Sequence, residues 1–391
     1  MKTEIKNQVL ADLAQLIQKN AKQIIQANAI DLQLCSQTDA ALYDRLKVDQ
    51  KKIDTMQESI NKVKQMNDPQ GKVLYSYQKQ ADLLVENKVV PFGTLLIIYE
   101  SRPDVTIEAA ITAFKAGNKI LLKGGKEAKN SNLLLTKLWH QALANNDQDR
   151  QWVQYLDLSR EQTQELMKNN DLGIDVIIPR GGEGLINWIK HNTNIPLIIS
   201  GRGNNFMYID ADADLQMAEN IILDGKKRIS VCNALDKVFI HPAHKIADLH
   251  GIAQAIKQAG IRLIADNNLA SIADEVLTDE SIMYEEFLSA KILLSQVENL
   301  QLAIEKINLY SGGHSAVIVT NNQENAQIFQ EKVDCAAVYH NASTRFTDGG
   351  EFGLGAEIAI STQKLHFRGP VGLNELVTNK WFIRGTGHIR G

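Results

Sequence analysis

The sequence predicts an α/β protein with two doubly wound domains and an additional extended arm. Short, continuous apolar runs recur along most of the chain, amphipathic helical patterns separate them, and two more polar segments stand apart. Continuous apolar strands that alternate with helices are typical of a parallel sheet covered on both faces. The length of 391 residues fits about two domains, because one domain usually holds roughly 100–200 residues.

The N-terminal part of the chain has a helical repeat. Apolar residues such as Leu13 and Ile17, and later Ile53 and Ile60, follow at spacings of three and four. We expect helices through about residue 70, with these stripes facing a core.

Two segments are predicted to be extended. Residues 72–90 alternate loosely between apolar and polar, which predicts a long hairpin that is too polar for a central strand. The tail 361–390 is rich in β-branched and aromatic residues interrupted by glycine, and we expect a C-terminal arm there.

The strands of the two domains are expected where the apolar runs lie. Those of the first domain are Thr94–Tyr99, Lys119–Leu122, Trp152–Leu156, Ile174–Ile178, Leu197–Ile199 and Phe206–Ile209. Those of the second are Lys237–Ile240, Arg262–Ile264, Ile292–Leu294, Ala316–Thr320 and Ala336–Tyr339.

Composition excludes several classes of function. The 42 basic and 46 acidic residues give a net charge of −4, which offers no general attraction to nucleic acid. No apolar stretch is long enough for a membrane span, and the N-terminus lacks an apolar signal segment. The three cysteines form no CxxC pair, so neither a disulfide framework nor a metal centre is expected, and a reducing cytoplasm fits best.

Common catalytic motifs are absent from the sequence. It contains no GxxxxGK[ST], GxSxG or HExxH string. Gly201-Arg-Gly203 resembles the start of a dinucleotide fingerprint, but Phe206 stands where the third glycine belongs, so the string carries no weight.

The cysteines differ in their surroundings. Cys35 and Cys335 stand among apolar residues and are expected to be small buried side chains. Cys232 follows a helix that ends in three cations and precedes a strand. A thiol with a pKa of about 8.5 is only a few per cent thiolate at pH 7. The positive charge of Lys227 or Arg228 nearby could lower this pKa and raise the thiolate fraction. From the residues alone, a catalytic and a structural thiol both remain open.

Two glycine-rich loops each join an expected strand to an expected helix. Lys123-Gly-Gly-Lys126 and Arg180-Gly-Gly182 suit a phosphate, since glycine lets backbone approach a ligand and a helix N-terminus attracts anions. A solvated basic turn and a plain αβ turn are the alternatives. Together the two loops favour a dinucleotide.

Longer strings give the sequence a family resemblance. Tyr99-Glu-Ser-Arg-Pro-Asp-Val-Thr106, Leu122–Ala128, Ser230-Val-Cys-Asn-Ala234 and above all Asn341–Glu357 resemble the gamma-glutamyl phosphate reductases, a branch of the aldehyde dehydrogenase superfamily. The resemblance runs from about residue 1 to Ile360–Pro370 and the C-terminus.

The resemblance implies an aldehyde dehydrogenase-like fold with two doubly wound α/β domains and a β-rich oligomerisation arm. An NADPH-binding domain is expected over 1–228, with the 72–90 hairpin in the arm. A catalytic domain with Cys232 is expected over 229–345, and a return segment and C-terminal arm over 346–391.

The implied reaction is the NADPH-dependent reduction of L-glutamyl 5-phosphate to L-glutamate 5-semialdehyde, the second step of proline biosynthesis. Cys232 would form a thioester with the acyl group, and no metal is needed. The Cys232 backbone N–H is expected to stabilise the oxyanion, with Asn233 beside the thiol and Asp104 at the position of a side-chain oxyanion donor.

The implied binding residues follow from the same matches. Those expected to bind NADPH are Lys123, Gly124, Gly125, Lys126, Arg180, Gly181 and Gly182. Those expected to bind substrate are Asn341, Ser343, Thr344 and Arg345, of which Arg345 would pair with the glutamyl α-carboxylate.

The sequence also departs from the family pattern. Asp104 stands where many members have Asn, and an ionised Asp cannot donate to an oxyanion, so it is either protonated or directed elsewhere. Ile199 replaces a usual Glu, which is tolerable because acyl-phosphate reduction needs no attack by water. Arg202, Ile229 and Ala316 differ as well.

Two alternatives to this function remain open. One is another acyl-phosphate or aldehyde substrate on the same fold, and the other is a catalytically weakened homologue that acts as an interaction subunit. Expected partners are the small-molecule substrate, a glutamate kinase that supplies it, and further copies of the chain in a homodimer or homotetramer. No nucleic acid or membrane partner is expected.

Overall fold

The structure, a computed structural model, describes residues 1–35, 40–79 and 82–390 and divides the chain into two compact units. The first unit holds Met1–Ile199, Gly353–Ala359 and Val371–Gly391, and the second holds Ser200–Phe352 and Ile360–Pro370. The chain therefore returns to each unit near its C-terminal end. No helix in the described part is both long and apolar enough to cross a membrane.

The first unit begins with the predicted helices. Leu13 and Ile17 of the first helix, and Ile53 and Ile60 of the fourth, are fully buried in one apolar cluster, so the predicted stripes face the core. The helices are α1 (Thr3–Lys19), α2 (Ala21–Leu34), α3 (Ala40–Leu46) and α4 (Gln50–Gln65). Part of the predicted helical region, residues 36–39, lies outside the described residues.

A parallel sheet of four strands forms the centre of this unit, in the order β5-β4-β3-β6. The strands are β3 (Thr94–Tyr99), β4 (Lys119–Lys123), β5 (Val153–Tyr155) and β6 (Val176–Arg180). The helices that alternate with them are α5 (Val105–Lys115), α6 (Lys129–Ala144), α7 (Arg160–Asn169) and α8 (Glu183–Asn192).

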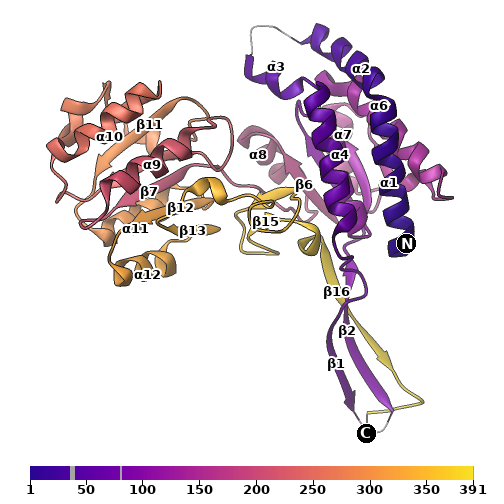
Figure 1. The fold of residues 1–391 in the computed structure, drawn as a ribbon. Coiled ribbons are helices and arrows are strands. Elements are labelled where there is room, and N and C mark those ends of the chain that lie inside the picture. Colours follow the sequence, from indigo (N-terminus) through magenta and orange to yellow (C-terminus); the bar gives the residue numbers. More distant parts are fainter. Residues whose placement is uncertain (36–39, 80–81, 391) are drawn as a thin grey trace. The chain divides into compact units, whose positions relative to one another are not determined.

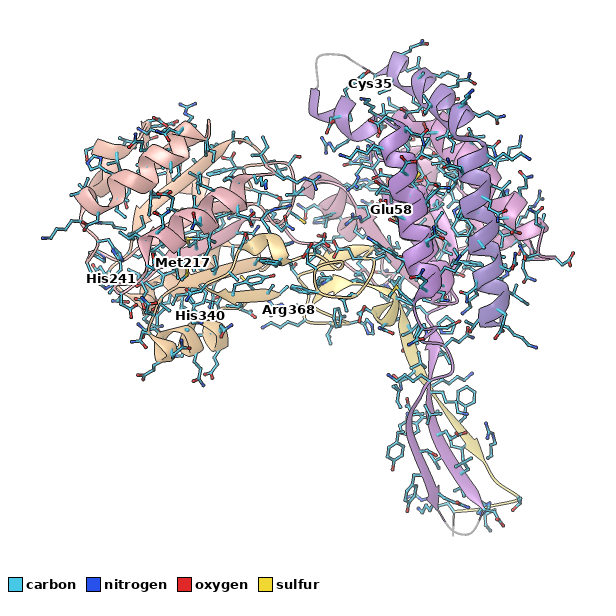
Figure 2. All side chains as sticks on the ribbon, in the orientation of Figure 1. Cys35, Glu58, Met217, His241, His340 and Arg368 are labelled. Atoms are coloured by element: carbon cyan, nitrogen blue, oxygen red, sulfur yellow. The ribbon has the colours of Figure 1, made fainter. Side chains whose placement is uncertain are left out.

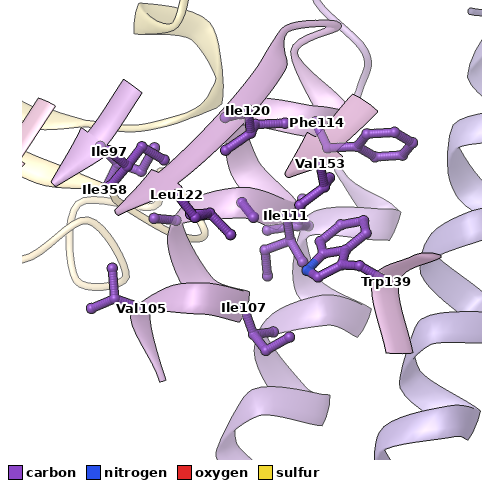
Figure 3. Close-up of a cluster of buried hydrophobic side chains, with 14 of the residues drawn as sticks. Ile97, Val105, Ile107, Ile111, Phe114, Ile120, Leu122, Trp139, Val153 and Ile358 are labelled. Atoms are coloured by element: carbon purple, nitrogen blue, oxygen red, sulfur yellow. The ribbon is translucent and has the colours of Figure 1, made fainter. Parts of the chain in front are cut away.

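Side chains of β3 show that both faces of the sheet are covered. Leu95 and Ile97 belong to the cluster that includes α1 and α4, whereas Leu96 and Ile98 belong to a second cluster with α7 and α8. Figure 3 shows the first cluster, which includes the edge-on pair of Phe114 and Trp139 with ring centroids 5.4 Å apart. The doubly wound prediction is confirmed for this unit.

Three antiparallel strands form the arm, in the order β1-β2-β16 (Figure 1). They are β1 (Val73–Lys79), β2 (Leu83–Pro91) and β16 (Val377–Arg384), so both extended segments predicted from the sequence contribute. The expectation that the hairpin holds no central strand was wrong, because β2 is the middle strand. Its polarity is compatible with that place since β1 and most of β16 are exposed to solvent.

The second unit holds a parallel sheet of seven strands in the order β10-β9-β11-β8-β7-β12-β13. The strands are β7 (Asn205–Ile209), β8 (Leu235–Ile240), β9 (Arg262–Ala265), β10 (Glu275–Val276), β11 (Lys291–Gln296), β12 (Ser315–Val319) and β13 (Ala337–His340). Two apolar clusters cover its faces. The helices are α9 (Leu215–Lys226), α10 (Ile246–Gln258), α11 (Leu300–Tyr310) and α12 (Gln323–Lys332).

The boundary between the units differs from the expected one at 228. The run Phe206–Ile209, expected in the first sheet, lies in β7, which pairs with β8 and β12 in the second sheet. Residues 200–228 therefore belong to the second unit. The run Leu197–Ile199 forms only an isolated bridge, between Leu197 and Ile177, and not a strand.

Candidate active site

Cys232 lies in a loop between α9 and β8 of the second unit and is half-buried. The other two cysteines are buried, as predicted, and Cys35 lies at the end of α2 (Figure 2). Burial raises the pKa of the Cys335 thiol to about 11, so this thiol is unsuited to nucleophilic chemistry near neutral pH. Of the three thiols, that of Cys232 is therefore the most accessible to a substrate.

Gly203 packs directly against the thiol loop. A Cβ added at Gly203 would lie 2.1 Å from the Cys232 carbonyl oxygen and 2.5 Å from its Cα atom. Only glycine fits such an approach without moving the Cys232 backbone. The string Gly201-Arg-Gly203, which carried no weight as a dinucleotide fingerprint, thus has a structural role at the candidate nucleophile.

The side chain of Asn233, the residue after Cys232, binds a second loop, residues 341–347. Its Nδ2 donates to the carbonyl oxygens of Arg345 and Thr347 at 3.1 Å each, and its Oδ1 accepts from Arg345 Nη1. Thr344 Oγ1 donates to the Asn233 carbonyl oxygen at 2.9 Å. Both amide protons of Asn233 are used, so in this arrangement its side chain holds the loop and has no proton left for an oxyanion.

The loop 341–347 is shaped by its own polar side chains. Asn341 has a positive φ of 55°, which Asn tolerates better than most residues, and its side chain bonds both the N–H and the C=O of Thr320. Ser343 Oγ accepts from the Arg345 N–H at 3.2 Å. Arg345 is half-buried and supplies the loop's positive charge. The loop therefore places one guanidinium beside the residue that follows Cys232.

Buried hydroxyls connect this loop to a histidine. Thr347 Oγ1 lies 2.7 Å from both Ser315 Oγ and the Tyr339 hydroxyl, and Ser315 Oγ lies 2.8 Å from His314 Nδ1. Burial lowers the pKa of His314 to about 4, so its ring is neutral near pH 7. This network could not be predicted from the sequence, because its members come from three separate segments.

A carboxyl group also lies close to the thiol loop. Glu286 accepts a hydrogen bond from the Gly203 N–H, and burial raises its pKa to about 7 against the lowering effect of this bond and of Arg202. A group with that pKa can hold or release a proton near neutral pH. The sequence analysis missed Glu286, since no motif marks an isolated Glu in a loop.

In the first unit, the predicted cofactor residues share one edge of the sheet. Lys123 ends β4 and Arg180 ends β6, and β3, β4 and β6 are parallel, so the loops after them lie at the same edge. Ligands of open α/β sheets usually bind at this carboxyl edge. Lys123 Nζ donates to the Gly124 carbonyl oxygen at 2.7 Å, burial lowers the pKa of Lys123, and Lys126 is exposed.

Glu127 ties the loop after β4 to the loop after β3. Its Oε1 accepts from the Ser101 N–H at 2.8 Å and from the Ser101 hydroxyl at 2.7 Å. Added Cβ atoms would collide with Asn132 at Gly124 and with Glu127 at Gly125. The two glycines therefore leave room for the side chains that hold these loops.

Glu100 occupies the N-terminal end of α8. The Gly182 N–H donates to Glu100 Oε2 at 3.2 Å, and a Cβ at Gly181 would lie 2.6 Å from the same oxygen. The start of a helix binds anions, and here it binds a carboxylate. The donors therefore fit the pyrophosphate of a dinucleotide, which would have to displace Glu100.

Asp104 is buried at the start of α5 and pairs with Arg102 at 2.8 Å. In this ion pair Asp104 Oδ2 accepts from Arg102 Nη2, so the carboxylate offers no proton to an oxyanion. Glu108, one helical turn later, has its pKa raised to about 7 by burial and by the negative charge of Asp104.

The structure thus gathers the predicted residues into two groups. Cys232, Asn233 and the 341–347 loop meet in the second unit, and the Lys123 and Arg180 loops and Asp104 share an edge in the first. Over residues 1–35, 40–79 and 82–390, no three His, Cys, Asp or Glu side chains are grouped to hold a metal ion.

Comparisons with known proteins extend over nearly the whole chain. The profile described as "Aldehyde dehydrogenase family" matches residues 1–261 and 269–355. Gamma-glutamyl phosphate reductase from Clostridium botulinum (strain Alaska E43 / Type E3) is 43% identical over 396 residues, with 99% of this chain and 95% of the relative covered. The enzyme of that name from Enterococcus faecalis is 43% identical, with 100% of this chain and 94% of the relative covered. The crystal structure of gamma-glutamyl phosphate reductase from Thermotoga maritima has a TM-score of 0.95 at 38% identity and covers 100% of this chain and 95% of that chain.

Proposed function

This chain belongs to the aldehyde dehydrogenase family, among its gamma-glutamyl phosphate reductases, and we propose that it reduces L-glutamyl 5-phosphate to L-glutamate 5-semialdehyde and phosphate. The observation that carries the proposal is the half-buried Cys232 thiol, held between Gly203 and a loop that carries a guanidinium. In proline biosynthesis from glutamate, this reaction is the second step.

Covalent catalysis begins at Cys232. Its thiolate attacks the acyl carbon of the substrate, the bond from that carbon to the phosphate oxygen breaks, and phosphate leaves with the electron pair. The product is a thioester on Cys232. The Cys232 backbone N–H is the proposed donor to the oxyanion that forms during the attack. The side chain of Asn233 supports this geometry indirectly, because it holds the loop 341–347. The carboxylate of Asp104 accepts from Arg102 and is not proposed as an oxyanion donor.

Reduction of the thioester requires a hydride, which NADPH supplies when it is bound. The collapse that follows returns the thiolate to Cys232 and releases the aldehyde. No water attacks the thioester in this scheme, and Ile199, buried at the position of the usual Glu, cannot activate one.

The residues proposed to bind the cofactor are chosen because they carry positive charge or because their backbone N–H groups can approach a phosphate. Gly182 and its neighbour Gly181 would hold the pyrophosphate at the start of α8, with Arg180 beside them. Lys123 would reach the adenosine ribose from the end of β4. The exposed Lys126 would meet the 2′-phosphate, which is the basis for preferring NADPH over NADH.

Arg345 is the proposed partner of the substrate's α-carboxylate. Its guanidinium is anchored by one bond to Asn233 and carries further N–H donors. Asn341, Ser343 and Thr344 support the loop by bonds to backbone groups, and we propose that they shape the substrate pocket in this way.

The arm is the proposed site of assembly into a homodimer or homotetramer. Its outer strands β1 and β16 leave edges that can pair further, and Tyr75, Tyr77, Trp381 and Ile383 are exposed there. We also propose that the chain works in the cytoplasm, where its free thiols remain reduced, and receives substrate from a glutamate kinase.

One assay tests this function: purified protein with L-glutamate 5-semialdehyde, phosphate and NADP⁺, followed by NADPH formation. We expect turnover that depends on phosphate. Activity with other aldehydes alone would point to another substrate on the same fold, and inactivity with every aldehyde would point to an interaction subunit.

A further inference from the structure

Asn205, the first residue of β7, binds the backbone of Cys232 and of the residue two positions after it. Its side chain is fully buried, and its Nδ2 lies 2.8 Å from the carbonyl oxygen of Cys232 and 2.7 Å from that of Ala234. The same nitrogen lies 3.0 Å from the carbonyl oxygen of Gly203. Two amide protons thus serve three acceptors, so at least one proton is shared between two of them.

An irregularity in the sheet directs Asn205 toward this loop. Asn205 is opposite Leu235 on β8, but Phe206 is opposite Lys237, so Asp236 is an extra residue. Such bulges bend a strand and redirect side chains, and they are common next to active sites.

Asp236 itself is fixed on both of its oxygens. It accepts from Lys226 Nζ at 2.6 Å in a buried ion pair and from the Phe287 N–H at 2.8 Å. The bulge, and with it the direction of Asn205, is therefore firmly held.

The contacts determine the orientation of the peptide that joins Cys232 to Asn233. Because a trans peptide is planar, its C=O and N–H point in opposite directions. With the Cys232 carbonyl bonded to Asn205, the Asn233 N–H points away from Asn205. Gly203 packs against the same peptide, and the Asn233 side chain holds the loop at Arg345.

We propose that Asn205 is a positioning residue for the Cys232 nucleophile, with Gly203 providing the space that lets it act. This inference rests on the proposed function only in that Cys232 is the nucleophile. Asn205 acts through the Cys232 backbone: it keeps the thiol and the neighbouring backbone donors in one arrangement.

The adjacent Asn204 offers a matched control. It is also fully buried, and its Nδ2 donates to the carbonyl oxygens of Met283 and Tyr310 at 2.7 and 2.8 Å. Its Oδ1 accepts from Lys237 at 2.6 Å. Neither carbonyl belongs to the thiol loop, so Asn204→Ala removes a comparable buried amide at another place.

The test compares Asn205→Ala, Asn205→Asp and Asn204→Ala with the unaltered chain. The rate of Cys232 alkylation by iodoacetamide is followed against pH by peptide mass spectrometry, and kcat and KM are measured with the semialdehyde assay. For Asn205→Ala we expect kcat to fall by about 10- to 100-fold with KM nearly unchanged, since a small misplacement of a reacting group costs about that much. The alkylation profile should shift as well. Asn204→Ala should leave the alkylation profile in place.

Asn205→Asp keeps the shape of the side chain but removes both N–H donors. When the introduced carboxyl group is protonated, it regains one donor, its O–H. Its deficit against the unaltered chain should therefore shrink as the pH falls, which a purely structural defect would not show. If Asn205→Ala does not fold, the same alkylation and kinetic measurements are made on Asn205→Asp and Gly203→Ala.

Unaltered alkylation and kcat in the Asn205 variants would overturn the proposal, as would equal losses in Asn204→Ala. Because alkylation needs no substrate, it also separates this proposal from the proposed function: a chain inactive on the semialdehyde still reports the effect of Asn205.

Discussion

The loop around Cys232 and the loops expected to bind the cofactor are held by different chemistry. Around Cys232, neutral amides of Asn205 and Asn233 bind backbone carbonyls. At the carboxyl edge of the first sheet, the carboxylates of Glu100 and Glu127 bind backbone N–H groups. The two amide side chains at the thiol loop are uncharged, whereas the two carboxylates at the first sheet carry negative charge where an anion is expected.

This difference separates a permanent support from one that a ligand can displace. A buried amide–carbonyl bond does not change with pH or salt in the physiological range, so the bonds of Asn205 and Asn233 persist even where Glu286, on the Gly203 N–H, changes its protonation. A carboxylate on a helix N-terminus competes with any anionic ligand for the same N–H groups. The thiol loop is therefore preorganised for its candidate nucleophile, whereas the carboxylate at the loops expected to bind the cofactor can be replaced by a ligand.

The largest effect is expected from replacement of the candidate nucleophile. Cys232→Ser should lower turnover by more than about 10³-fold, because a hydroxyl is a far weaker nucleophile than a thiolate, while the fold stays intact. The measurement is NADPH formation together with circular dichroism. Cys35→Ser and Cys335→Ser are the controls and should change stability more than kcat. Full activity in Cys232→Ser would refute the covalent mechanism.

His314 is the titratable member of the otherwise neutral network behind the thiol loop. Its folded pKa of about 4 lies below the usual 6.5, so the unfolded chain takes up a proton first as the pH falls. Stability should therefore decrease from about pH 6.5 down to about pH 4, by about 3 kcal/mol from this group. Urea unfolding at several pH values measures it. The difference between the unaltered chain and His314→Gln isolates the contribution, and an identical pH dependence in the two would contradict it.

Arg345 is bonded to the neutral side chain of Asn233 and is the proposed partner of the substrate carboxylate. Arg345→Ala should raise KM for the acyl substrate by about 10- to 100-fold, since a charge-assisted pair with the carboxylate is lost. Arg345→Lys should recover only part, because an ammonium cannot form the bidentate fork. Arg262→Ala removes an exposed cation paired with Glu275 and serves as the control. An unchanged KM in Arg345→Ala would remove its assignment.

The smallest effect concerns the displaceable brace. Glu100→Gln should tighten NADPH binding by about 2- to 5-fold, because a negative charge leaves the helix N-terminus where the pyrophosphate is expected. Calorimetric titration of NADPH measures it. Glu127→Gln should not tighten binding, since Glu127 bonds Ser101 and not the helix. Weaker binding in Glu100→Gln would mean that Glu100 supports the cofactor site.

Local patterns in the sequence predicted most helices and strands. The assignment of strands to sheets was less successful, because it depends on pairing between distant segments. Thr94–Tyr99 matches β3 residue for residue, and Cys35 and Cys335 are buried as predicted. Assignment of Phe206–Ile209 to the first sheet failed because β7 pairs with β12, more than 100 residues later, and nothing in the apolar run reveals its partner.

The candidate site was predictable where a motif marked it. Cys232, Asn233 and the 341–347 loop come together as the strings indicated. Asn205 could not be found, because its role depends on a bulge opposite Asp236, and Gly203 was set aside because it failed a different motif.

The arm also has a consequence for biosynthesis. β2 ends at Pro91, but its neighbour β16 begins only at Val377, so roughly 290 residues are made in between, which takes about 15–60 s at ordinary rates of translation. During that time the nascent chain exposes one side of β2, and the whole of 200–352 emerges from the ribosome first. A chain that terminates before β16 would keep this edge of β2 open to other chains, so the edge becomes protected only after β16 has been made.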